Sequence, residues 1–125
     1  MSESVLDASV LVEALTGGRT LSLVSGANAP AHVHVEVASA LRSLQRRGAL
    51  RREEAATAFE DVCELPIRTW SLHALLPSAW DLRDELSIYD ALYVALAVHL
   101  DLPLATLDHR LARAAGRYCS VLTVP

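Results

Sequence analysis

Four carboxylates lie inside apolar runs of this sequence, and any fold that buries these runs must accommodate them. They are Asp7, Glu36, Asp90 and Asp108. Between Ile88 and Val98 the only charged residue is Asp90, and neither Lys nor Arg stands beside any of the first three carboxylates. An ionised carboxylate costs several kcal/mol to bury unless it is paired or hydrogen-bonded. Each of the four therefore needs a hydrogen-bonding partner or a cation.

The apolar patterns predict strands that alternate with helices. Short apolar runs at 4–7, 67–70, 102–106 and 119–124 are typical of buried strands, whereas residues 28–30 (Asn-Ala-Pro) are typical of a turn. Helices are expected over 9–15, 20–25, 33–47, 52–65, 75–86, 88–100 and 108–115. This order favours a single α/β domain over residues 1–125, with three layers and a mainly parallel central sheet.

Three of the carboxylates are expected at one edge of that sheet. Asp7 and Asp108 each follow a strand, and parallel sheets bind ligands beyond the carboxyl ends of their strands. The helix at 88–100 must end at the opposite edge, because the strand at 102–106 begins there, so Asp90 near the helix start lies at the ligand edge. Glu36 has no such placement, because two expected helices separate it from the next strand.

Carboxylates that meet in this way repel one another. A pair of charges about 5 Å apart repels by about 3 kcal/mol at an effective dielectric near 20. A hard divalent cation with oxygen ligands removes this cost. The arrangement therefore favours metal-assisted chemistry on a phosphate.

Simpler explanations exist for the same side chains. Ser87 and Asp90 fit a helix capping box, and Asp7 and Asp108 suit helix N-caps. Ser9 and Thr106, each two residues from a carboxylate, would orient that carboxylate or a metal-bound water, or would cap their own helix locally. His32 and His34 suggest zinc, but a spacing of two residues on a helix points their rings apart. Tyr93 is expected in the core or at an interface.

The charge distribution says more than the net charge of −4. The chain has no lysine, and its 11 basic residues are all arginines. Two groups of them flank the expected acidic site, and Arg42, Arg46 and Arg110 are the members we expect to contact the phosphate backbone of a nucleic acid. The alternative is that these arginines only solvate helix ends, where cations favour the helix dipole.

The remaining composition indicates a cytoplasmic protein without a membrane segment. Its apolar stretches are too short to span a bilayer, and no basic region typical of a signal peptide precedes Asp7. The two cysteines, Cys63 and Cys119, lack metal-ligand spacing and are expected to be buried thiols in a reducing compartment.

Each carboxylate stands within a longer motif. The motifs are Val5-Leu6-Asp7-Ala8-Ser9, Val35-Glu36-Val37-Ala38-Ser39-Ala40-Leu41-Arg42, Tyr89-Asp90-Ala91-Leu92-Tyr93-Val94-Ala95-Leu96-Ala97 and Thr106-Leu107-Asp108-His109-Arg110-Leu111-Ala112. In this order and spacing they resemble the motifs of PIN-domain ribonucleases, and most closely those of VapC toxins of bacterial type II toxin–antitoxin modules.

The resemblance implies a PIN-like three-layer α/β/α domain with a sheet of about four to five strands. It also implies an Mg²⁺ or Mn²⁺ site, endonucleolytic RNA cleavage, a homodimer and a cognate VapB-like antitoxin. By the same resemblance Asp7, Glu36, Asp90 and Asp108 are the metal-binding and catalytic residues. Some relatives carry another acidic residue after the equivalent of Asp108, where this chain has His109, so the number of metal ions stays open.

The resulting hypothesis is hydrolysis of RNA by a metal-activated water. One alternative is an inactive PIN-like module that binds RNA or a protein. Another is a phosphotransfer domain, which the absence of lysine and the serine at position 9 disfavour. We further expect a homodimer through the helix with Leu75, Leu76, Trp80 and Leu82, and an antitoxin peptide over exposed apolar residues of the first two helices. Those residues are Val10, Leu11, Leu15, Leu21 and Leu23.

Overall fold

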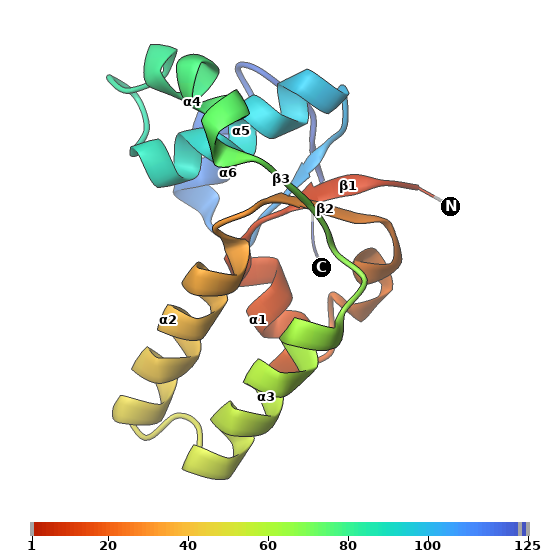
Figure 1. Cartoon of the computed structure of the whole chain (residues 1–125), viewed down its shortest axis with the longest axis vertical. Helices are drawn as coiled ribbons and strands as arrows, with labels where there is room; N and C mark the ends of the chain where they lie inside the picture. Colours follow the sequence, from red (N-terminus) through yellow and green to blue (C-terminus); the bar gives the residue numbers. More distant parts are fainter. Residues whose placement is uncertain (1, 123, 125) are drawn as a thin grey trace.

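The computed structural model, which describes residues 2–122 and 124, is built on one sheet of parallel strands. The strands are β1 (Ser4–Leu6), β2 (Ala27–Pro30), β3 (Arg68–Trp70), β4 (Leu104–Ala105) and β5 (Val121–Leu122). They lie in the order β3-β2-β1-β4-β5 (Figure 1). In register, Val5 of β1 pairs with Asn28 of β2 and with Leu104 of β4. The expected parallel α/β sheet is confirmed, whereas the expectation that residues 1–125 form one domain stays a prediction.

Helices cover both faces of the sheet. The α-helices are α1 (Ala8–Thr16), α2 (Val33–Arg46), α3 (Arg52–Glu64), α4 (Leu72–Asp81), α5 (Ile88–Leu100) and α6 (His109–Ala115), and η1 (Leu21–Gly26) is a 3₁₀ helix. In Figure 1, α1, α2 and α3 lie on one side of the sheet and α4, α5 and α6 on the other. Within the described residues, no helix has the length and apolar character needed to cross a membrane.

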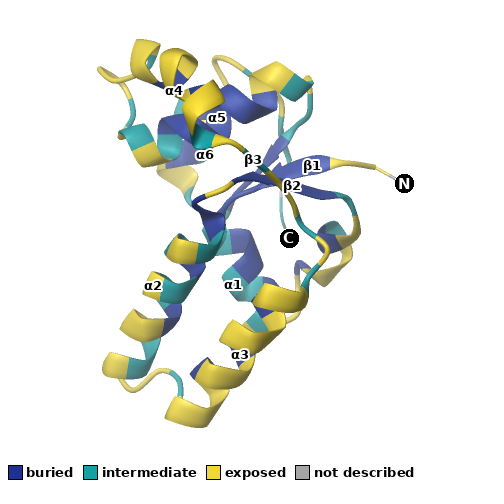
Figure 2. Cartoon of the chain, in the orientation of Figure 1, coloured by how far each residue is buried: buried dark blue, intermediate teal, exposed yellow. Residues whose placement is uncertain are grey.

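The most buried helix is α5. Every residue from Ala91 to Ala97 is buried, because α5 packs against β1, β2 and β4 on one side and against α4 on another (Figure 2). A helix that is apolar all round belongs in a core. Its N-cap is Ser87, whose Oγ accepts a hydrogen bond from the Asp90 backbone N at 3.2 Å, as the capping pattern predicted. The core helix thus starts with a carboxylate beside the sheet edge.

The expected turn at residues 28–30 is wrong, because this segment is strand β2, which is buried throughout. Asparagine usually marks a turn, but the Asn28 side chain finds partners on both neighbouring strands. Its Nδ2 lies 3.4 Å from the Ser4 carbonyl O, and its Oδ1 accepts from Trp70 Nε1 at 3.1 Å. Since β2 leads directly into α2, Glu36 in the first turn of α2 also follows a strand at the carboxyl edge.

Helix α4 also differs from the expected bounds of 75–86. Strand β3 ends at Trp70, whose carbonyl O accepts from Ala31 N at 2.9 Å, and extended Ser71 then starts the helix at Leu72. Pro77 consequently lies inside α4 and not in its first turn. The segment after Asp81 forms turns instead of continuing the helix, and Leu86 N donates to Leu82 O at 3.0 Å. The remaining elements agree with the expected ones within a few residues, and residue 123 of the last expected strand lies outside the described part.

Two expectations about surfaces need correction. Val10 and Leu11 are fully buried, because α1 packs against α2 and α3, so the first two helices do not expose the apolar surface that we expected. Of the five residues named for this surface, only Leu21 is exposed. The cysteines are free thiols, but Cys63 at the end of α3 is exposed and not buried.

Candidate active site

Asp7, at the end of β1, is the most deeply buried of the four carboxylates. It is the N-cap of α1, and its Oδ1 accepts from Val10 N at 3.2 Å and from Ser9 Oγ at 2.5 Å. Its Oδ2 accepts from the Thr106 hydroxyl. Burial raises the pKa of Asp7, and the nearby Asp90 charge adds to this, although the three hydrogen bonds oppose it. The side chain is fixed in place but its negative charge is not neutralised.

The hydroxyls of Ser9 and Thr106 join the loops that follow β1 and β4. Ser9 Oγ accepts from Leu107 N at 2.9 Å, and Thr106 Oγ1 accepts from Asp108 N at 3.0 Å. Each hydroxyl therefore holds the Asp7 carboxylate while it is itself held by the backbone that leads to Asp108. The expected contact of both hydroxyls with a carboxylate is present, and their contact with a metal-bound water stays a prediction.

Asp90 interacts electrostatically with each of the other three acidic residues. Its carboxylate is half-buried, and burial together with the charges of Asp108 and Glu36 raises its pKa, against the effect of Arg110. Asp108 is the N-cap of α6, where its Oδ1 accepts from Arg110 N at 2.9 Å and from Leu111 N at 3.2 Å. Asp7 and Asp108 therefore cap helices as expected, while the charge of Asp90 interacts with those of the other carboxylates, so the capping roles do not exclude a shared site.

Glu36 is held by two aromatic side chains that the sequence patterns did not assign to the site. The Tyr93 hydroxyl donates to Glu36 Oε1 at 2.6 Å, and His32 Nε2 lies 3.3 Å from the same atom. Burial, then the hydrogen bond and the Glu36 charge, raise the pKa of Tyr93 far above its usual value, so Tyr93 is a phenol that donates. Tyr93 is a core residue, as expected, and it also orients Glu36.

His32 connects α2 to the start of α5. Its Nε2 lies 3.2 Å from the Tyr89 carbonyl O, and its ring centroid lies 4.9 Å from that of Tyr93. Both neighbours of Nε2, the Tyr89 carbonyl and Glu36 Oε1, are acceptors, so Nε2 carries the proton. Two spacings in the sequence could have assigned these two side chains to the site. His32 precedes Glu36 by four residues and Tyr93 follows Asp90 by three, which are the spacings of neighbours on one helix face.

Comparison with known proteins identifies the family. The PIN domain model matches residues 4–117. Ribonuclease VapC3 of Mycobacterium tuberculosis is 41% identical over 117 residues, which cover 88% of this chain and 85% of that protein. Ribonuclease VapC1 of the same species is 38% identical over 133 residues, with 99% of each chain covered. This chain belongs to the VapC family of PIN-domain ribonucleases.

The fold agrees with membership of the VapC family. The crystal structure of PAE2754 from Pyrobaculum aerophilum matches with a TM-score of 0.70 and covers 90% of this chain and 86% of the other, at 22% identity. At this identity the match shows the shared fold alone. The family model and the two VapC relatives confirm the resemblance of the four motifs to PIN-domain ribonucleases, and to VapC toxins in particular.

The chemistry of this VapC site suits a hard divalent cation. We call the four carboxylates Asp7, Glu36, Asp90 and Asp108 the acidic centre, and carboxylate oxygens are the ligands that Mg²⁺ and Mn²⁺ prefer. The raised pKa values of Asp7 and Asp90 reflect burial and repulsion between neighbouring carboxylates, which the charge of Arg110 only partly offsets at Asp90. In the described part of the chain, however, no three His, Cys, Asp or Glu side chains are grouped closely enough to hold an ion. Ligation of one ion by three of these carboxylates therefore requires them to come closer together.

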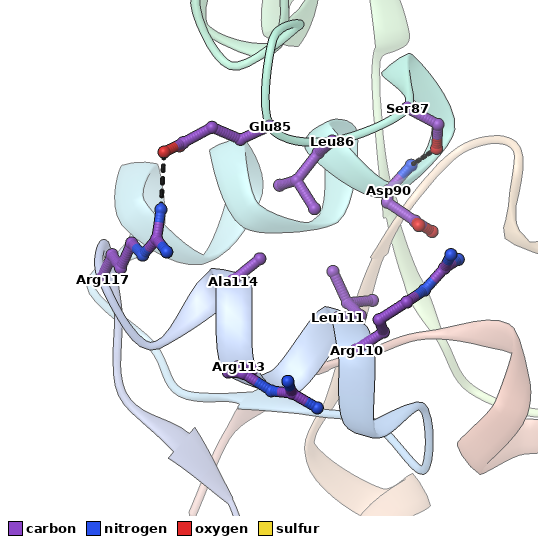
Figure 3. A pocket seen from close by; sticks show the side chains of 9 residues that line it. All are labelled: Glu85, Leu86, Ser87, Asp90, Arg110, Leu111, Arg113, Ala114 and Arg117. Carbon is purple, nitrogen blue, oxygen red and sulfur yellow. Dashed lines mark hydrogen bonds and ion pairs between the residues drawn. The ribbon is translucent and has the colours of Figure 1, made fainter.

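The arginines that we expected to contact RNA lie in two different places. Arg110 of α6 lines a cleft together with Asp90, and Figure 3 shows its side chain extending toward the Asp90 carboxylate. Arg42 and Arg46 lie six and ten residues beyond Glu36 on α2, which is about 9 and 15 Å along the helix axis. Arg42 faces a groove between α2 and α3. Only Arg110 of these three borders the acidic centre.

Proposed function

We propose that this VapC ribonuclease cleaves RNA by in-line attack of water on a phosphodiester at the acidic centre, with Mg²⁺ or Mn²⁺ as cofactor. The observation that carries the proposal is the position of Asp90, which interacts electrostatically with each of Asp7, Glu36 and Asp108. The four carboxylates follow β1, β2 and β4 or begin α5, so segments distant in sequence contribute to one edge of the sheet. Such a concentration of negative charge favours a bound cation.

Each side chain has a distinct part in this proposal. Asp7, Asp90 and Asp108 hold the cation directly, and Asp7 is kept in position by the Ser9 and Thr106 hydroxyls. When bound, the cation lowers the pKa of a water molecule and offsets the charge that develops on the phosphate. Glu36 ligates the cation, holds a second one, or takes the proton of the attacking water. Tyr93 and His32 limit the directions in which Glu36 can point.

The toxin role and the partners of the protein follow from its family. We propose RNA as substrate and a VapB-like antitoxin as the inhibitory partner, and the cytoplasmic location expected from the sequence stays a prediction. For the expected homodimer, α4 offers Trp80 and Leu76, which are 58% and 42% exposed. Leu75 is buried inside the protomer and does not belong to that surface.

An RNA cleavage assay tests the catalytic proposal. We expect cleavage with Mg²⁺ or Mn²⁺, none after chelation by EDTA, and none for Asp90→Asn. Asp101→Asn is a matched control, because Asp101 follows the other end of α5 with a φ of 53°, a conformation that asparagine adopts readily. Cleavage that continues in EDTA, or in Asp90→Asn, contradicts the metal mechanism.

A second candidate function is an inactive module that binds RNA or a protein partner. The observation that favours it is that no three acidic side chains in the described residues are grouped in a ligating arrangement. A Mn²⁺ titration separates the two candidates. Saturable binding that Asp90→Asn removes supports the nuclease, whereas no binding supports the inactive module.

A further inference from the structure

A cleft of about 430 Å³ opens directly beside the acidic centre. It lies between α6 and the loop that precedes α5, and Asp90 forms part of its wall (Figure 3). Leu86 and Leu111 line it with apolar side chains, and Arg110, Arg113 and Arg117 supply three cations. The cleft thus joins a strongly negative site to a row of positive charges.

The three arginines that line the cleft come from α6 and from the turn that follows it. Arg110 and Arg113 are one helical turn apart on α6, and Arg117 follows four residues later. All three are exposed to solvent. In the described part of the chain, the Arg113 guanidinium makes neither a hydrogen bond nor an ion pair, which leaves all its donors available to a ligand.

Arg117 differs from Arg113 because it already forms an ion pair with a carboxylate. Arg117 Nη1 donates to Glu85 Oε1 at 2.7 Å, and the Tyr118 hydroxyl donates to the other oxygen of Glu85. Figure 3 shows this ion pair spanning one end of the cleft, while Asp90 and Arg110 lie at the other. Glu85 therefore places a negative charge at this end of the cleft and offsets the charge of Arg117.

We propose that this cleft binds backbone phosphates of the RNA next to the scissile one, with Arg113 as the main contact and Glu85 as a competitor that weakens binding at Arg117. The inference rests on the proposed cleavage of RNA at the acidic centre. A polyanion that approaches four carboxylates is repelled, and adjacent cations offset this repulsion. Guanidinium groups suit the task because their planar donors match phosphate oxygens.

Two substitutions with opposite expected effects on RNA affinity test the proposal. Arg113→Gln removes one phosphate contact, so binding of a fluorescein-labelled single-stranded RNA of mixed sequence weakens. The negative slope of the logarithm of the association constant against the logarithm of the salt concentration becomes less steep by about 0.7. Glu85→Gln removes the competing charge and keeps an acceptor for Tyr118, so the same RNA binds more tightly. Fluorescence anisotropy in EDTA measures binding without cleavage.

Arg47→Gln is the matched control, because it removes the same charge from an exposed position at the far end of α2. We expect it to leave both the affinity and the salt slope unchanged. An Arg113→Gln protein that behaves like Arg47→Gln overturns the proposal, and so does a Glu85→Gln protein that binds RNA no more tightly than the wild type.

Metal binding separates this inference from the proposed function. The cleft variants are expected to bind Mn²⁺ as the wild type does and to cleave RNA with a raised KM for Arg113→Gln, a lowered KM for Glu85→Gln and an unchanged kcat. If the wild type cleaves RNA with Mn²⁺ but KM does not move in these variants, the cleft proposal fails while the catalytic one stands. If the wild type binds RNA through Arg113 but does not cleave it with any divalent cation, the catalytic proposal fails.

Discussion

Replacing Tyr93 by phenylalanine removes the shortest hydrogen bond to Glu36 and little else. The ring of Tyr93 is buried against the core, and phenylalanine retains it, so the change creates no large cavity. The hydroxyl donates to Glu36 Oε1 at 2.6 Å. Any effect of Tyr93→Phe on metal binding therefore reports on the orientation of Glu36.

The size of the effect follows from the exposure of the pair. A hydrogen bond to a charged group contributes about 1.5–3 kcal/mol when desolvated. The Glu36 side chain is 31% exposed and keeps His32 Nε2 at 3.3 Å, so we expect a loss of about 1 kcal/mol in the free energy of unfolding without metal. Side chains that orient a metal ligand typically contribute 10- to 100-fold in affinity, and we expect Mn²⁺ binding to weaken by about tenfold, or about 1.4 kcal/mol.

Two measurements check this prediction. Isothermal titration with Mn²⁺ gives the affinity, and RNA cleavage at increasing Mn²⁺ is expected to reach a near-normal rate only at higher metal concentration. Tyr89→Phe is the matched control, because Tyr89 is 65% exposed and phenylalanine keeps both its backbone carbonyl and the ring that lies 6.0 Å from that of His32. Equal Mn²⁺ affinity for Tyr93→Phe and Tyr89→Phe would refute the reasoning that Tyr93 positions a metal ligand.

Three further predictions concern the acidic centre and the surface of α4. Asp90→Asn is expected to raise the Tm of the metal-free protein at pH 7, since the raised pKa of Asp90 means that its ionised form destabilises the fold. This rise in Tm should vanish as the pH falls to about 3.9 or below, where the carboxyl is protonated in both the folded and unfolded states. A Tm of Asp90→Asn below that of the wild type at pH 7 contradicts the prediction. Thr106→Val is expected to lower the free energy of unfolding by about 1–3 kcal/mol and to raise the pKa of Asp7 further, because it removes a hydrogen bond to the carboxylate. As the pH is lowered, Mn²⁺ binding should then be lost at a higher pH than in the wild type. An unchanged pH profile of Mn²⁺ binding contradicts this prediction. Trp80→Ser is expected to convert the dimer to a monomer in light scattering with little loss of stability, and a monomeric wild type counts against this interface.

The carboxylates at strand ends could be predicted because their constraint is local. Asp7 and Asp108 follow short apolar runs, and Asp90 opens a nearly continuous apolar helix, so the rule that parallel strands end at one edge places all three. The caps could be predicted for the same reason, since each depends on residues two or three positions apart. Ser87, Asp7 and Asp108 all cap as their patterns indicated.

The position of Glu36 could not be predicted, because it depends on recognising β2. Asn28 and Pro30 are turn residues by propensity, and only the neighbouring strands supply the partners that make Asn28 acceptable inside a sheet. The contacts of Tyr93 with Glu36 and of His32 with the Tyr89 carbonyl join α2 to α5 over long sequence separations, which no local pattern contains, whereas the spacing of His32 and Glu36 is local. The same holds for the cleft, whose charges come from α6 and from the loop before α5.

A Mn²⁺ titration of the wild type beside Asp90→Asn, monitored by electron paramagnetic resonance, tests the account most directly. Free Mn²⁺ gives a signal that disappears when the ion is bound, so the measurement needs neither the RNA nor the antitoxin. The account predicts saturable binding to the wild type and to Asp101→Asn, and no binding to Asp90→Asn. Equal binding by all three proteins, or binding by none, would contradict the claim that the carboxylates around Asp90 hold the catalytic cation.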